Sequence, residues 1–384
     1  MHISTLKLKE KIETFPFQVA EHLIFLNKPQ DIHSILQKHS NCAVAILSFS
    51  EAENMPSYFD NIRLSWYELA ANFNQGNCID CGHFYEDINL LKDIIRILKE
   101  HKILPIILSP DALPSLEIAP FLESACEYTA PIISVISSHI PYILNYKTKA
   151  ELPFHKKTLI NHLWHINPKF QINAFGFQTY YIDKLVLAQM DKKGSELLRI
   201  GQVQANIQNI EHLLRGTNLL SFDIASIKHS EAPQSYFPKA IGLSAVNACQ
   251  IVRYAALSNS LQVINIHGYV PPKEMSYNLD ITAGVLAKML WFIVSSNLQK
   301  SEDYPVLITH LQEHIVLCKD IEFPISFFKN KRSDKWWFAM AEWEFIEKDQ
   351  HNPFLIPCSE MDYIQTKEGE LPERLWKFLI KTSF

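Results

Sequence analysis

Residues 220–233 read LSFDIASIKHSEAP, and no other segment says more about the architecture of this chain. An apolar run ends there in Asp223, a loop with Ala-Pro follows, and Gly242–Ser244 then precedes a helical segment, Ala245–Leu257. Ser244 stands where its hydroxyl can accept hydrogen bonds from the free amides of that helix's first turn. A buried strand, a loop and a capped helix in this order predict one unit of a parallel sheet covered by helices.

Short apolar runs alternate with helical segments from about residue 43 to 296. The runs are apolar nearly throughout, which is typical of strands buried on both faces. Between them, Ile88–Glu100 keeps its apolar side chains on one face, as an amphipathic crossover helix does. We therefore expect a mainly parallel sheet with helices on both sides. The expected strands are Ala43–Phe49, Leu104–Leu108, Ile132–Ile136, Ile172–Phe177, Leu198–Val203, Leu219–Ile224 and Leu261–Ile266.

The pattern changes near residue 300, so we expect residues 1–300 to form the main domain, with 1–40 packed on it as an N-terminal segment. Residues 301–384 then form a C-terminal extension packed on that domain. The extension holds four of the seven tryptophans, which can bury much aromatic area. Its run FFKNKRSDKWW, residues 327–337, mixes basic and aromatic side chains as a nucleic-acid platform does. We interpret it as a solvated turn followed by a strand whose tryptophans pack inward, because the whole chain is acidic.

The composition fits an ordinary globular protein. The 384 residues are 47% hydrophobic and 20% charged, with a net charge of −5, which excludes a disordered chain and gives no reason to expect nucleic acid or an anionic membrane as partner. Glycines number only 10, and neither GxGxxG nor GxxxxGK[ST] occurs, which excludes the standard nucleotide cradles.

Targeting signals and cysteine usage both predict a cytoplasmic protein. The N-terminus is too polar for a signal peptide, and the most apolar stretch, 283–296, is short and holds Lys288. The seven cysteines are scattered, which favours reduced thiols. Cys78 and Cys81 form a CxxC, but no second pair follows at zinc spacing, so we do not expect a metal or redox site there.

The segment around Asp223 resembles the ureohydrolase family of arginases, agmatinases and formimidoylglutamases. Other landmarks of that family align in order over roughly residues 40–296: CIDCG at 78–82, LPIILSPDA at 104–112, IISVISSHIP at 132–141 and FGFQ at 175–178. SFDIASIKHSEAP at 221–233, ACQIVRYAALS at 248–258, the 327–337 run and PCSEMDY at 357–363 resemble one divergent bacterial branch, usually labelled formimidoylglutamase or arginase-like. The resemblance implies a three-layer αβα fold of arginase type with a mainly parallel sheet of about eight strands.

The resemblance also implies a site with two manganese ions, whose bound hydroxide attacks a guanidinium or formimidoyl carbon. The family's six protein ligands come from three motifs, and this chain retains two of them, His139 and Asp223. The remaining ligand positions hold residues that cannot replace a carboxylate or histidine: Ala112, Ser137, Pro141 and Ala225. Asp111, beside Ala112, is a weaker candidate.

Two register choices affect this assignment. A shift of one residue in the 132–141 motif puts Ser138 at the histidine position and leaves only Asp223. The family's substrate-contacting glutamate falls on Gly268, and His267 could serve as a weak catalytic candidate only after a shift in register.

Three other interpretations of these residues stay open. Asp111, His139, Asp223, His229 and His267 could share one rim of the sheet and form a relocated single-metal site. Ser137 or Ser138 with His139 and Asp223 could suggest a serine triad, but we expect neighbouring strand residues to point to opposite faces, and no G-x-S-x-G elbow occurs. Asp223 could instead have a structural role and accept hydrogen bonds that hold its turn.

From these residues we expect a catalytically degenerate ureohydrolase-fold protein, a pseudoenzyme with a binding, scaffolding or regulatory role and no cofactor. The alternative is a working formimidoylglutamase or arginase-type hydrolase of amidines that uses manganese in a rebuilt site. A nucleic-acid binder acting through the basic, Trp-rich extension is a third class, which we do not expect. The resemblance implies a homo-oligomer, and an unknown protein partner is the other expectation.

Overall fold

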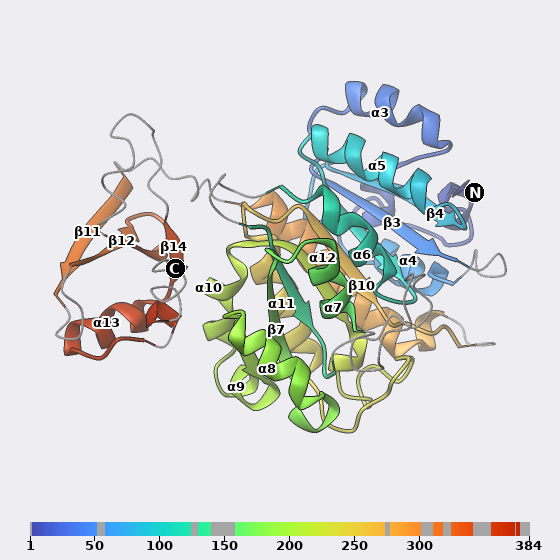
Figure 1. Ribbon diagram of the computed structural model, residues 1–384. Helices are drawn as coiled ribbons and strands as arrows, with labels where there is room; N and C mark the ends of the chain where they lie inside the picture. The colour runs from blue at the N-terminus through green and yellow to red at the C-terminus, as the bar shows by residue number, and fades with distance from the viewer. Residues whose placement is uncertain are drawn as a thin grey trace.

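The computed structural model describes residues 2–51, 58–123, 130–139, 158–272, 277–300, 310–317, 324–340, 355–372 and 374–376. Within them the chain forms a ten-stranded sheet in the main domain and a four-stranded sheet near the C-terminus (Figure 1). The large sheet has the strand order β1-β4-β3-β5-β10-β9-β6-β7-β8, with β2 also paired to β4. Every pairing in it is parallel except that of β1 with β4. The strands of the large sheet are β1 (His2–Ile3), β2 (Leu23–Phe25), β3 (Val44–Ser50), β4 (Cys78–Tyr85), β5 (Leu104–Ser109), β6 (Ile132–Ile136), β7 (Gln171–Phe177), β8 (Leu197–Arg199), β9 (Thr217–Asp223) and β10 (Val263–His267).

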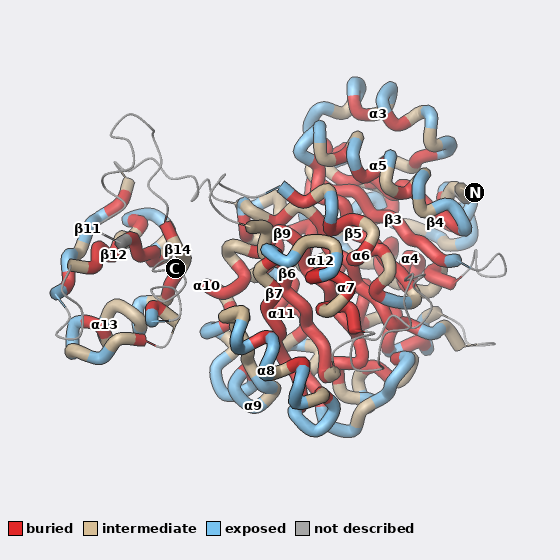
Figure 2. Tube along the Cα trace, viewed as in Figure 1, coloured by how far each residue is buried: buried red, intermediate tan, exposed pale blue. Residues whose placement is uncertain are grey.

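Helices cover both faces of this sheet, which confirms the expected three-layer α/β architecture. Strand side chains alternate between two hydrophobic clusters, so that Ile106 and Ile264 pack on one face while Ile107 and Val263 pack on the other. The central strands β3, β4, β5, β9 and β10 are therefore buried throughout (Figure 2), whereas β2 and β8 are partly exposed. The first face is covered by helices α4 (Asp60–Tyr67), α9 (Ile200–Ala205), α10 (Glu211–Leu214), α11 (Ala245–Ala256) and α12 (Ile281–Leu298). The second face is covered by α3 (Ile32–Lys38), α5 (Ile88–Glu100), α6 (Leu113–Ile118), α7 (Leu159–Ile166) and α8 (Lys184–Lys192); the short helices α1 (Leu6–Lys9) and α2 (Val19–His22) belong to the N-terminal segment.

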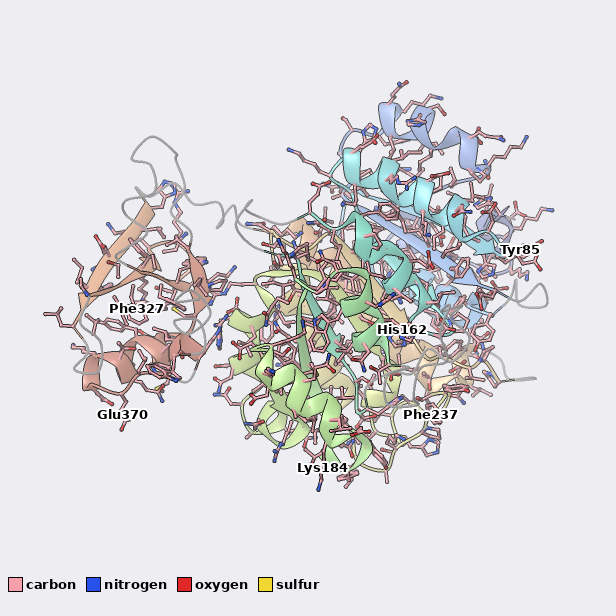
Figure 3. All side chains as sticks on the ribbon, in the orientation of Figure 1. Tyr85, His162, Lys184, Phe237, Phe327 and Glu370 are labelled. Atoms are coloured by element: carbon pink, nitrogen blue, oxygen red, sulfur yellow. The ribbon has the colours of Figure 1, made fainter. Side chains whose placement is uncertain are left out.

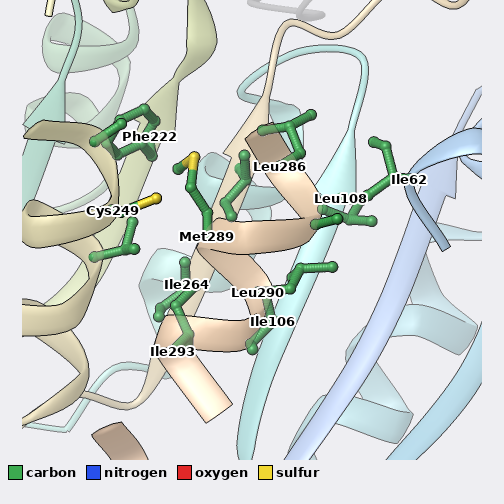
Figure 4. Packing of buried hydrophobic residues seen from close by; sticks show 14 of the residues in the cluster. Ile62, Ile106, Leu108, Phe222, Cys249, Ile264, Leu286, Met289, Leu290 and Ile293 are labelled. Carbon is green, nitrogen blue, oxygen red and sulfur yellow. The ribbon is translucent and has the colours of Figure 1, made fainter. Parts of the chain in front are cut away.

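Helix α12 fills the centre of the first face. Met289, Leu290 and Ile293 meet Ile106 of β5 and Ile264 of β10 in one packed group (Figure 4). By length and composition alone α12 resembles a membrane span, but 61% of its apolar window is buried within the fold. Burial between the sheet, α4 and α11 accounts for its uniformly apolar sequence.

Several elements differ from the sequence-based expectation, among them β1 and β2, since no strand was expected before Ala43. The strand expected at Leu198–Val203 ends at Arg199, where α9 begins; the side chain of Gln202 accepts a hydrogen bond from the Arg199 amide (2.8 Å), as in a helix-starting capping box. Strand β4 was not expected, because Asp80, Gly82 and His83 interrupt its apolar run.

A buried polar network explains how β4 accommodates Asp80. The Arg63 guanidinium of α4 lies against that carboxylate, with Nε 3.0 Å from Oδ2, and also donates to the Ser48 hydroxyl and the Gly82 carbonyl (both 2.9 Å). The Tyr67 hydroxyl donates to the same Asp80 oxygen (2.6 Å). All of these side chains are buried, so the network ties α4 to β3 and β4 through the interior.

His83 of β4 adds a pH dependence to this network. Its ring nitrogens lie 2.8 Å from the Ser48 hydroxyl and 3.1 Å from the Ser50 hydroxyl. Burial, together with the Arg63 charge, lowers the pKa of His83 to about 3, from an ordinary value of 6.5. The unfolded chain therefore takes up a proton between pH 6.5 and about 3 that the folded chain does not.

We expect His83 alone to cost the protein up to about 1.4 kcal/mol of unfolding free energy per pH unit as the pH falls from 6.5 to 5. His83→Asn should flatten the pH dependence measured by urea unfolding across this window. His101→Asn, at the exposed end of α5, is the control and should leave the slope unchanged. Equal slopes for both variants would show that His83 is protonated in the folded protein.

The C-terminal residues that the structure describes form an antiparallel sheet in the order β11-β12-β13-β14, with helix α13 beside it. Its adjacent Trp336 and Trp337 are both buried and belong to different hydrophobic clusters, one on each face, so they pack inward as the sequence suggested. Trp343 lies outside the described residues, and Trp376 is exposed. The elements are β11 (Leu311–Val316), β12 (Ile325–Asn330), β13 (Trp336–Met340), β14 (Ile356–Cys358) and α13 (Glu360–Glu368).

Arg215, directly after α10, joins this sheet to the main domain. Its guanidinium donates to the backbone carbonyls of Trp336 in β13 and Cys358 in β14 (both 2.8 Å), and lies 5.1 Å from the centre of the Trp337 ring. The Glu211 carboxylate of α10 accepts a hydrogen bond from the Arg215 Nε, and its Oε2 also lies 3.0 Å from Nη2. Charged donors on carbonyl oxygens contribute about 1.5–3 kcal/mol.

Arg215→Ala should therefore release the C-terminal sheet without unfolding the main domain. We expect amides of β13 and β14 to exchange with deuterium at least about tenfold faster, since this corresponds to about 1.4 kcal/mol, while β9 and β10 keep their protection. Arg96→Ala on α5, whose ion pair is exposed, should change neither region. Uniformly faster exchange in Arg215→Ala would contradict a local role.

Candidate functional site

The carboxyl ends of β5, β6, β9 and β10 meet at one edge of the sheet, and most of the candidate residues lie there. Ile136 of β6 pairs with Phe222 of β9, and Asp223 pairs with His267 of β10. Ser137, which follows β6, is thereby brought next to Asp223. We call this edge the rim.

Asp223 is buried, and hydrogen bonds within the rim occupy both of its carboxylate oxygens. Oδ1 accepts from the backbone amide of Ala225 (2.8 Å), and Oδ2 accepts from the hydroxyl of Ser137 (2.8 Å). These bonds close the turn after β9, which is the structural role considered from the sequence. The sequence resemblance implies a carboxylate at position 137. This chain has Ser137 there, and its hydroxyl donates to the Asp223 carboxylate.

His139 lies close to Asp223 without a hydrogen bond to it. The distance from Nδ1 to Asp223 Oδ2 is 3.6 Å, and the imidazole packs edge-on against the Phe237 ring at 5.4 Å. Burial lowers the pKa of His139 and outweighs the opposing effect of the Asp223 charge. The ring is therefore neutral at physiological pH.

The rim does not have the geometry of a serine triad. The expectation that Ser138 and His139 point apart is wrong, because β6 ends at Ile136 and strand alternation no longer applies: Ser138 Oγ lies 3.5 Å from His139 Nδ1. The Ser138 hydroxyl nevertheless donates to the Ala225 carbonyl (2.9 Å). Asp223 approaches the same ring nitrogen, whereas a triad needs serine and aspartate on opposite nitrogens.

The remaining metal-motif positions that the structure describes, apart from Ser137, hold alanine, and Asp111 lies beside one of them. Ala112 is buried just before α6, and exposed Asp111 uses its Oδ1 to accept from the Leu113 amide (2.9 Å). Ala225 is buried, and Pro141 lies outside the described residues. Among the residues that the structure describes, no three His, Cys, Asp or Glu side chains converge as a metal-binding group.

His267 belongs to a buried chain of hydrogen bonds that the sequence did not suggest. Its Nε2 lies 3.1 Å from the Ser221 hydroxyl, which accepts from Ser115 of α6 (3.1 Å); Asn265 joins Ser115 (2.9 Å) to Ser109 (2.8 Å). Burial lowers the pKa of His267, so its ring is neutral. Isolated polar residues inside apolar runs were the only signal of this chain of contacts.

Gly268, which occupies the position of the family's substrate-contacting glutamate, leaves no room for a side chain. Its φ is +94°, and a Cβ atom there would lie 2.9 Å from Asp223 Oδ1. Any larger residue would combine backbone strain with a clash against the carboxylate. This position therefore cannot present a glutamate to the rim in the observed geometry.

The other two candidate groups do not join the rim. His229 is exposed, and its backbone amide donates to the Lys239 carbonyl (2.6 Å). Cys78 and Cys81 lie three apart on β4, so they enter the hydrophobic clusters on opposite faces of the sheet. Burial raises the pKa of both thiols well above the ordinary value.

Comparison with known proteins supports the fold. No protein-family model and no curated protein sequence matches this chain. A Trypanosoma cruzi formiminoglutamase crystallised with Mn²⁺ matches with TM-score 0.56 and 17% identity over 69% of this chain and 96% of that one. Agmatine ureohydrolase of Thermoplasma volcanium matches with TM-score 0.54 and 14% identity over 75% of this chain and 96% of that one. Formimidoylglutamase of Bacillus subtilis matches with TM-score 0.55 and 14% identity over 74% of this chain and 92% of that one.

These matches and the strand order define a protein with a three-layer α/β fold. More particularly, the chain has an arginase-type fold, which confirms the fold implied by the sequence resemblance. At 14–17% identity the likeness concerns the fold alone.

Proposed function

We propose that this chain is a catalytically degenerate ureohydrolase-fold protein with a binding, scaffolding or regulatory role. One observation carries the proposal: Asp223, the acidic ligand position that survives at the rim, already has both oxygens in hydrogen bonds to Ala225 and Ser137. Manganese prefers carboxylate, imidazole and water ligands, and neighbouring carboxylates also compensate its charge. The side chains of the described rim that could ligate a metal do not fit a pair of such ions.

The rim instead satisfies its polar groups internally. Ser138 donates to the Ala225 carbonyl, and His267 enters the hydrogen-bonded chain through Ser221. A site that must assemble a charged metal and a cationic substrate would need several carboxylates here, whereas the negative charges that act on His267 come from Asp223 and the exposed Asp111.

A turnover assay tests this proposal against an amidine hydrolase with a rebuilt manganese site. The protein and its Asp223→Ala variant are incubated with excess Mn²⁺, and release of urea from arginine and agmatine and of formamide from formimidoylglutamate is measured. We expect both proteins to match the uncatalysed rate. Manganese-dependent turnover that is lost in Asp223→Ala would overturn the proposal and establish the hydrolase.

A further inference from the structure

Next to the rim, four aromatic side chains are strongly exposed to solvent. The exposed fractions are 65% for Tyr180, 42% for Tyr181, 65% for Tyr236 and 46% for Phe237. We call these four residues, together with Lys239, the aromatic platform. Single exposed apolar side chains are common, but a contiguous exposed group indicates a binding surface.

Ring contacts show that the platform is contiguous. Tyr180 and Tyr181 pack edge-to-face at 4.7 Å, as do Tyr236 and Phe237 at 4.5 Å. The Lys239 ammonium joins the two pairs, since it lies 4.1 Å from the centre of the Tyr181 ring and 5.3 Å from that of Phe237. Phe237 lies at the periphery of the main domain, far from Phe327 in the C-terminal sheet (Figure 3).

Backbone contacts hold the platform in place. The Gln178 side-chain amide, just before Tyr180, donates to the Ile241 carbonyl (2.8 Å), which ties the end of β7 to the loop that carries Phe237. The Tyr236 amide donates to the Gly268 carbonyl (2.8 Å) after β10. Rings that are fixed before binding lose little conformational entropy when a partner covers them.

Lys239 supplies the positive charge of the platform. No carboxylate of the described residues lies within 4 Å of the Lys239 ammonium. The acidic side chains nearest in sequence are already engaged: Asp183 accepts from the Leu185 amide (2.8 Å), and Glu231 accepts from the Ala245 amide (2.5 Å) and pairs with Lys228. Asp223 is bound inside the rim. Asp183 and Asp223 keep their negative charges, since their hydrogen-bond donors are neutral, but the Lys239 ammonium is the cation that lies against the exposed rings.

We propose that the aromatic platform binds a segment of a partner protein that presents an acidic side chain next to an apolar or aromatic one. The carboxylate would meet Lys239, and the neighbouring side chain would cover the tyrosine and phenylalanine rings; tyrosine is enriched at the centres of protein interfaces. A nucleic acid fits less well, because it requires several phosphate-binding cations and the platform as defined contains a single one, Lys239. The inference rests on the binding role proposed above.

The test uses fluorescein-labelled short peptides that pair Asp or Glu with Phe, Leu or Pro, and a matched set with Lys in place of the acid. Fluorescence anisotropy is measured with the full-length protein, with Lys239→Glu and with Tyr236→Ala. The controls are Lys169→Glu, an exposed lysine just before β7 at the opposite edge of the sheet, and Trp376→Ala, an exposed aromatic residue elsewhere. Circular dichroism melting confirms that each variant is folded.

We expect peptides of the acidic set to bind, Lys239→Glu to weaken them at least about tenfold and Tyr236→Ala to weaken them at least about threefold, with both controls unchanged. Absence of binding, equal binding of the lysine set, or binding unaffected by Lys239→Glu would overturn the inference. So would tighter, Lys239-dependent binding of a thymidine oligonucleotide. If the peptides do not bind and the turnover assay shows no amidine hydrolysis, only this inference is wrong. If the turnover assay shows manganese-dependent hydrolysis, the proposed function itself is wrong.

Discussion

Replacement of Asp80 by alanine is expected to lower the free energy of unfolding by about 3–5 kcal/mol, since it leaves a buried guanidinium without its carboxylate. Arg63 and Asp80 are both buried, with Nε 3.0 Å from Oδ2. Tyr67 and the Gly82 amide would also lose their acceptor, at 2.6 and 2.8 Å. Several buried donors would then lack an acceptor at once. The resulting loss of unfolding free energy exceeds the net stabilisation that the intact pair provides.

Urea unfolding followed by circular dichroism measures this loss, and Asp93→Ala provides the matched control. Asp93 pairs with Arg96 at 2.8 Å on α5, but its side chain is 61% exposed. Exposed pairs contribute at most about 1 kcal/mol, so the control should lie close to the parent protein. A loss for Asp80→Ala no greater than for Asp93→Ala would mean that water reaches the Arg63 network.

Gly268→Ala is expected to cost about 2–4 kcal/mol, because backbone strain and overpacking add at this position. The φ of +94° disfavours any residue with a Cβ atom, and that atom would lie 2.9 Å from Asp223 Oδ1. The carboxylate can retreat only by breaking its hydrogen bond with Ala225 or Ser137. The substitution therefore measures how firmly Asp223 is held.

Two other glycines separate strain from contact in the same thermal or urea unfolding experiment. Gly369 has φ +96° with no atom within 4 Å of its Cβ position, so Gly369→Ala reports strain alone. Gly201, in α9, has open space and an ordinary φ, and Gly201→Ala should be neutral or stabilising by up to about 1 kcal/mol. We expect Gly268→Ala to be the most destabilising of the three. Equal losses at Gly268 and Gly369 would show that Asp223 moves aside freely.

The sequence predicted those elements whose local signals agree with their packing. Ile132–Ile136 and Ile88–Glu100 begin and end where expected, and Ser244 caps α11 by accepting from the Asn247 amide (3.0 Å). Strand β4 escaped prediction because its polar residues are paired with partners distant in sequence, chiefly Arg63. Burial of a charge depends on such long-range pairing, which periodicity does not reveal.

The rim was predictable in its location but not in its contacts. The motif alignment placed Ser137, His139 and Asp223 at one edge, and the structure brings these three side chains together. That Ser137 donates to Asp223 could not be inferred, since a hydroxyl can equally face solvent. The Ser115–Asn265 contact joins residues far apart in the chain and depends on how α6 lies on the sheet.

Metal analysis of the full-length protein tests most directly whether the rim has lost its ion site. The protein is expressed in manganese-supplemented medium, purified without chelator, dialysed, and assayed for metals by mass spectrometry beside Asp223→Asn. We predict no stoichiometric manganese in either protein and no difference between them. Two manganese ions per chain in the parent protein, reduced in Asp223→Asn, would contradict the account.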